Sequence, residues 1–319
     1  MIEGDIHLAI SAQQVKELRD LTDCGIMDCK KALIECDGDI EKAQGWLREK
    51  GMAKAEKKSS RVAAEGAVIA KIADDQKSGV LVEINVETDF AANTDNFKSF
   101  CDTVVNHIIE KKPATVEELM AQPLASDPSK TVELFQKEAI ANIGENTSIR
   151  RFAIFENNGL GAVTAYIHMG GKVGVFSEIC VGDDSVITKP EFADFAKNIN
   201  MQIAASRPGW VNEEDVPQAE LDRETEIIKN KALEEGKPEK IIMERIVPGQ
   251  VKNFYKMNCL VDQEYIKDED LSVKQYIDKT AKELGTELAV VRFTRFTLGE
   301  GIEKKADDFA EEVRKQAGL

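Results

Sequence analysis

The stretch that decides the fold is GAVIAKI at residues 66–72, because a near copy, GAVTAYI, recurs at residues 161–167. The two are 161 − 66 = 95 residues apart and agree at five of seven positions. The same offset aligns 66–113 with 161–208, where 16 of 48 positions are identical and chance would give roughly three. The chain therefore contains an internal duplication.

The second copy also carries an insertion. Gly144 corresponds to Gly285, an offset of 285 − 144 = 141, so 141 − 95 = 46 extra residues lie somewhere within 211–272. Apolar spacing within 213–258 predicts two helices in an antiparallel hairpin that turns at residues 235–238. We expect this hairpin to project from the body.

Each copy has the pattern of a strand hairpin, then helices, then a closing strand. The expected helices lie around 96–111 and 131–143 in the first copy and around 191–206 and 272–284 in the second, and the closing strands are 149–156 and 288–297. Two three-stranded antiparallel sheets, each with helices on one side, make an α+β body.

Ahead of the body, helical spacing from Ala12 to Met52 predicts a head of three short helices, broken at residues 22–25 and 37–39. The stretch 50–61, with five basic residues and one acid, favours a tether or exposed helix over a nucleic-acid contact. The expected domains are 1–50 (head), 51–62 (basic linker), 63–158 (first copy), 159–298 (second copy) and 299–319 (C-terminal helix).

Composition narrows the class of protein. The chain has 42 Lys and Arg against 58 Asp and Glu, a net charge of −16, which argues against a general nucleic-acid binder. No apolar run is long enough to cross a bilayer, so we expect a cytoplasmic protein without membrane contact. The six cysteines form no CxxC pair, which favours free thiols in the core.

Motifs for covalent chemistry are missing from the sequence. The P-loop, the nucleophile elbow and the common metal-ligand spacings are not found. We therefore predict a binding protein with no catalytic residue, no cofactor and no metal site. An acidic enzyme on a duplicated α+β scaffold remains the alternative.

One loop differs between the copies in an informative way. Thr88-Asp89-Phe90-Ala91 aligns with residues 183–186, so that Asp89 matches Asp184 while Phe90 matches Ser185. An aspartate at this point is as consistent with a turn as with a function. Because the second copy has serine there, the fold does not need an aromatic residue, and Phe90 is a candidate contact anchor.

These residues resemble the elongation factor Ts family, and the likeness covers nearly the whole chain. It includes VKELR at 15–19 followed by GIMDCKKAL at 25–33, which resembles that family's ubiquitin-associated-like head, and TDF at 88–90. IGEN at 143–146, His168 before a glycine turn, and GEGIEK at 299–304 also match in order.

The resemblance implies a guanine nucleotide exchange factor that binds elongation factor Tu carrying GDP, with no direct nucleic-acid contact. It implies that the loop Thr88, Asp89, Phe90 and Ala91 enters the GTPase and dislodges its magnesium ion. It also implies that the partner is contacted by the head residues Arg19, Ile26, Met27 and Lys30 and by the body residues Ile143, Gly144 and His168.

The chain departs from the family pattern at two places. Ala91 and Ala92 follow Phe90 where valine is common, and Pro248-Gly249 falls inside the second arm of the predicted hairpin. Because a proline inside a helix costs about 3 kcal/mol, we expect a bent or shortened arm. An adaptor without exchange activity is a further alternative.

Overall fold

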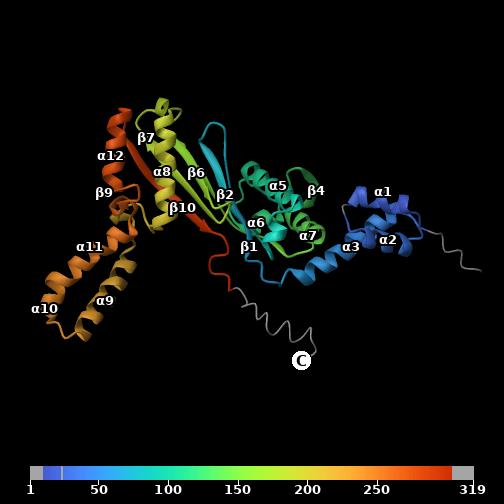
Figure 1. Ribbon diagram of the computed structural model, residues 1–319, viewed down its shortest axis with the longest axis horizontal. Coiled ribbons are helices and arrows are strands. Elements are labelled where there is room, and N and C mark those ends of the chain that lie inside the picture. The colour runs from blue at the N-terminus through green and yellow to red at the C-terminus, as the bar shows by residue number, and fades with distance from the viewer. Residues whose placement is uncertain (1–9, 23, 304–319) are drawn as a thin grey trace, which may run out of the picture. The chain divides into compact units, whose positions relative to one another are not determined.

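The computed structural model describes residues 10–22 and 24–303 (Figure 1). The described residues fall into two compact units: one from 10–22, 24–67, 83–151 and 298–303, the other from Val68–Val82 and Phe152–Thr297. In the described part of the chain, no helix is both long and apolar enough to span a membrane.

The head consists of α1 (Ala12–Thr22), α2 (Ile26–Glu35) and α3 (Ile40–Lys58), as predicted. Their buried apolar faces meet in a small core of its own, which includes Leu18, Leu33 and Leu47. The Asp39 carboxylate accepts the Lys42 amide at 3.0 Å and so caps α3. Because α3 continues to Lys58, most of the basic stretch is helix.

Two three-stranded sheets form the body. Strands β1 (Glu65–Ile72), β2 (Ser78–Val86) and β5 (Thr147–Glu156) make the first sheet in the order β1-β2-β5. Strands β6 (Gly161–His168), β7 (Val173–Val181) and β10 (Leu288–Thr297) make the second in the order β10-β7-β6, with antiparallel pairing. The predicted hairpins and closing strands are confirmed.

The duplication is visible in backbone geometry. Gly66 and Gly161 open the first strand of each copy with φ of +123° and +134°. A Cβ at either position would lie 2.1 Å from a carbonyl oxygen, that of Ile84 or Ile179 in the neighbouring strand. Only glycine allows both this conformation and this approach, which explains why both copies begin with it.

Helices accompany each sheet near the predicted positions. They are α4 (Asp89–Ala92), α5 (Asp95–Lys111), α6 (Val116–Ala121) and α7 (Val132–Ile143) in the first copy, and α8 (Pro190–Ser206) and α12 (Val273–Leu284) in the second. In the second unit α8 packs on β6 and β7, and its buried face includes Phe192, Phe195 and Ile199. The fold is therefore α+β, as predicted.

Two short strand hairpins, one in each copy, were not predicted. The pairs β3 (Pro123–Leu124) with β4 (Asp127–Thr131), and β8 (Glu264–Tyr265) with β9 (Asp268–Ser272), lie 264 − 123 = 141 residues apart. They are corresponding hairpins of the two copies, too short and too polar to leave a strand pattern. The insertion consequently lies before β8.

The insertion is a helical hairpin of α9 (Gln218–Glu234), α10 (Glu239–Ile241) and α11 (Val247–Asn258), which turns at Gly236 with φ of +74°. Figure 1 shows α9 and α11 side by side, extending away from β7 and β10 of the same unit. A small apolar cluster, Ile228, Ala232, Ile242 and Val247, holds the arms together.

Pro248 does not end the second arm. Residues Ile242–Ile246 form a π-helical segment directly before it, and helix continues through Pro248 to Asn258. A π segment widens the turn that the proline ring would otherwise crowd. The helix therefore changes its hydrogen-bond pattern instead of stopping at the proline, and the expected bend or shortening of the arm stays a prediction.

The predicted C-terminal helix over 299–319 lies, from residue 304 onward, outside the described residues. The expected domain boundaries stay a prediction.

Candidate partner-binding site

Thr88, Asp89, Phe90 and Ala91 form a single capped helical turn, α4. The Thr88 hydroxyl accepts the Ala91 amide hydrogen at 3.2 Å, and Thr88 is extended, as a helix cap should be. Ala91 is buried, whereas the Phe90 side chain is 85% exposed. The turn thus fixes a large apolar side chain in solvent, and Phe90 is not a core residue.

Asp89 differs from its counterpart in the second copy. Asp184 accepts the Gly161 amide at 2.7 Å and the Lys77 ammonium at 2.8 Å, and these contacts lower the pKa of its carboxyl group. The exposed carboxylate of Asp89 has no such partner among the described residues. The structural role therefore belongs to Asp184, which leaves Asp89 available for a contact.

Ile143 and Gly144 lie in the same unit as this turn, at the end of α7. Gly144 terminates the helix in the left-handed conformation, with φ of +86°. Its carbonyl accepts a hydrogen bond from the Lys58 ammonium of α3. The next residue, Glu145, belongs to the IGEN match but was not predicted as a site residue, and its carboxylate accepts the Thr88 amide at 2.9 Å.

The four head residues lie on α1 and α2. Ile26 and Met27, in the first turn of α2, are 55% and 74% exposed. Arg19 and Lys30 are also exposed. Exposed apolar side chains beside cations are suited to an interface with an acidic protein surface.

His168 belongs to the other unit, where it ends β6 before a glycine turn. It is exposed, and its Nδ1 lies 2.9 Å from the Tyr166 hydroxyl. The next residue, Met169, is 71% exposed. The geometry suits a contact role, since Tyr166 fixes the orientation of the imidazole.

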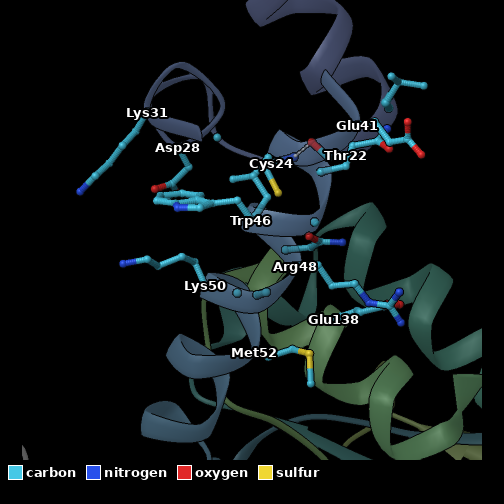
Figure 2. Close-up of a pocket in the computed structure, with 18 of the residues that line it drawn as sticks. Thr22, Cys24, Asp28, Lys31, Glu41, Trp46, Arg48, Lys50, Met52 and Glu138 are labelled. Carbon is cyan, nitrogen blue, oxygen red and sulfur yellow. Dashed lines mark hydrogen bonds and ion pairs between the residues drawn. The ribbon is translucent and has the colours of Figure 1, made fainter. Parts of the chain in front are cut away.

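A groove of about 650 Å³ lies between the head and α7 (Figure 2). Trp46 and Met52 supply apolar surface, the Lys50 ammonium lies 5.2 Å from the Trp46 ring centroid, and Arg48 pairs with Glu138 at 3.6 Å. The predicted contact residues are not among the described residues that line this groove. The sequence did not predict it.

The combination of a helical head, a duplicated α+β body with a helical hairpin in one copy, and an exposed aromatic residue on a capped turn defines a class of duplicated α+β proteins that present an apolar side chain to solvent. A family model described as Elongation factor TS matches residues 87–300. The chain belongs to the elongation factor Ts family.

Individual relatives agree with this assignment. Elongation factor Ts of Trichlorobacter lovleyi is 51% identical over 312 residues, which cover 98% of this chain and all of the relative. Elongation factor Ts of Clostridium botulinum is 47% identical over 309 residues, covering 97% and 99% of the two chains. That of Clostridium kluyveri is 47% identical over 307 residues, covering 96% and 98%.

Proposed function

We propose that this protein is a guanine nucleotide exchange factor that binds elongation factor Tu carrying GDP in the cytoplasm and accelerates GDP release. The family assignment supports a role in translation elongation. The observation that carries the exchange role concerns Phe90. Its side chain is 85% exposed on a turn capped by Thr88, and the second copy has Ser185 at the corresponding position. An aromatic side chain that keeps its apolar surface in water is suited to bury that surface in a partner protein.

In this proposal the Thr88–Ala91 turn inserts into the GTPase beside its magnesium ion. Magnesium bridges protein oxygens and nucleotide phosphates, and it is the largest local positive charge holding GDP. Phe90 would disturb that site by occupying space, and the exposed Asp89 carboxylate would disfavour the geometry that the ion needs. Loss of the ion then weakens GDP binding.

The exchange factor would form and break no covalent bond. It would act by linkage, because a partner that binds the empty GTPase more tightly than the GDP form must lower GDP affinity by the same factor. Arg19, Ile26, Met27, Lys30, Ile143, Gly144 and His168 would supply the affinity for the partner. The complex would be a heterodimer or a higher assembly with the GTPase.

The test is release of a fluorescent GDP analogue from purified elongation factor Tu, with and without this chain, together with co-purification of the two proteins. We expect a stable complex and an accelerated release that saturates with factor concentration. Binding without acceleration would show an adaptor, and neither binding nor acceleration would leave the enzyme alternative. Both results would overturn the proposal.

A further inference from the structure

The loop that carries Phe90 is held by two glutamates in a reciprocal arrangement. Glu145 accepts the Thr88 amide hydrogen at 2.9 Å, and Glu87 accepts the Asn146 amide hydrogen at 2.6 Å. Residues 87–88 follow β2, and residues 145–146 follow α7. Each of the two loops thus offers one carboxylate and one amide to the other, and we call this pair of contacts the double carboxylate clamp.

The clamp also determines the direction of the Thr88 hydroxyl. That hydroxyl donates to Glu145 Oε1 at 2.8 Å and accepts from the Ala91 amide at 3.2 Å. Glu145 therefore fixes the cap that begins α4. A helix of one turn does not nucleate by itself, so the cap decides whether the turn persists in the free protein.

The second copy provides an internal control. At the positions of Glu87 and Glu145 it has Gly182 and Thr286, neither of which carries a carboxylate. Its two loops are joined by a main-chain hydrogen bond, in which the Gly182 amide donates to the Glu287 carbonyl at 3.0 Å. The Thr286 hydroxyl oxygen is buried without a partner in the described chain.

The fold consequently joins these loops without a clamp, and a direct backbone contact is enough. The copy with the clamp is the copy with Phe90, while the copy without it has Ser185. We propose that Glu145, supported by Glu87, is a positioning residue that holds the Phe90 turn in its active geometry before the partner binds.

This inference rests on the proposed exchange function. Its physical basis is preorganisation: a turn ordered in advance does not lose conformational entropy on insertion, so more of the binding free energy acts on the nucleotide site. Removing the clamp should lower the coupling between factor and GDP more than it lowers affinity for the GTPase.

The test compares wild type with Glu145→Ala, Glu145→Gln and Glu118→Ala. Glu118 is the matched control, because its carboxylate also accepts a loop amide, that of Ala114 at 2.8 Å, but belongs to α6. The first readout is amide hydrogen exchange in the free protein. We expect protection at Ala91 to fall about tenfold in Glu145→Ala and to stay unchanged in Glu118→Ala.

The second readout is GDP release from elongation factor Tu over a range of factor concentrations. Glu145→Ala should lower the rate at saturation about tenfold with a smaller change in the half-saturating concentration, and Glu145→Gln, which keeps one acceptor oxygen, should restore part of it. If Glu145 had only a structural role, Glu145→Ala and Glu118→Ala would lower the saturated release rate equally, or Glu145→Ala would weaken affinity alone. Either result would overturn the proposal.

The two readouts also separate this inference from the exchange function. If wild type itself failed to accelerate release, the exchange proposal would be wrong, while the protection at Ala91 would still report on the clamp. If Glu145→Ala did not fold, Glu145→Gln and Thr88→Val would be compared in its place. Unchanged protection at Ala91 in both would contradict the clamp.

Discussion

Single residues gain their meaning here from comparison between the two copies. Glu83 and Glu178 occupy matched positions, and each pairs with a matched arginine, Arg151 or Arg292, with Nε 2.6 Å from a carboxylate oxygen. Because this ion pair occurs in both copies, it serves the fold. Phe90 and the clamp occur in one copy only, which is the reason to assign them to function.

The buried pair gives a prediction about acid stability. Burial raises the pKa of Glu83, but the Gly299 amide and the Arg150 and Arg151 guanidinium groups outweigh it, so the pKa lies below its ordinary value. A lowered pKa in the folded state stabilises the fold above the ordinary glutamate pKa of about 4.3, and this stabilisation is lost as pH falls through the folded value.

We therefore expect Glu83→Gln to unfold more easily than wild type at pH 7, by about 3 kcal/mol, since one partner of a buried pair is removed. The difference should shrink below pH about 4.3. Denaturant unfolding at several pH values measures it, with Glu178→Gln as the matched variant. A difference that stays constant down to strongly acidic pH would contradict the assignment.

At the scale of elements, the sequence predicted most of the fold because the duplication supplied each strong pattern twice. Helices and strands of the body fell near their predicted bounds, and the hairpin turned where a glycine and a proline stand. The short pairs β3-β4 and β8-β9 were missed, since strands of two residues, or of five residues that are mostly polar, leave no clear periodicity. The π segment before Pro248 was missed because it depends on hydrogen-bond geometry, not on residue type.

The helical hairpin should be dispensable for folding of the body. Its apolar cluster is separate from the core of its unit, which includes Val211 and Leu260 at its base. Replacing residues 218–257 with a short Gly/Ser link changes loop-closure entropy only slightly. We expect cooperative unfolding with a midpoint within about 4 °C of wild type.

Thermal unfolding followed by circular dichroism measures this, with the intact chain as reference. Loss of the cooperative transition in the shortened protein would show that the hairpin is part of the core.

The head should act as a docking element. Because α3 runs without a break from Ile40 to Lys58, cutting the chain at residue 50 would sever a helix, and point variants are the cleaner test. The double variant Ile26→Ala with Met27→Ala should weaken complex formation about tenfold, as truncated apolar anchors do, and leave maximal GDP release unchanged.

Ile34→Ala is the control for the head, since Ile34 is 48% exposed on the same helix but was not predicted to contact the partner. Titration of the GTPase against each variant gives the affinity. Equal affinities for the double variant and wild type would remove the docking role.

At the scale of the whole molecule, the proposed function divides two tasks among parts of one chain. Exposed residues of the head, half-buried Ile143 and exposed Gly144 at the end of α7, and His168 at the end of β6 are assigned to affinity, and one clamped turn is assigned to the effect on nucleotide. The sequence could indicate Phe90, because its counterpart is serine. It could not indicate the clamp, since Glu87 and Glu145 are ordinary acids 145 − 87 = 58 residues apart in an acidic chain.

The central claim is that Phe90 acts on GDP release beyond its share in affinity. The most direct measurement is the GDP dissociation rate at saturating factor for wild type, Phe90→Ala and Phe90→Leu, with Ser185→Phe added to Phe90→Ala as a test of position. We predict a cost in complex formation of about 1 to 2 kcal/mol for Phe90→Ala, a larger loss in saturated release, a partial loss for Phe90→Leu and no rescue by Ser185→Phe. Release by Phe90→Ala at the wild-type rate at saturation would contradict the claim and leave Phe90 as an affinity contact.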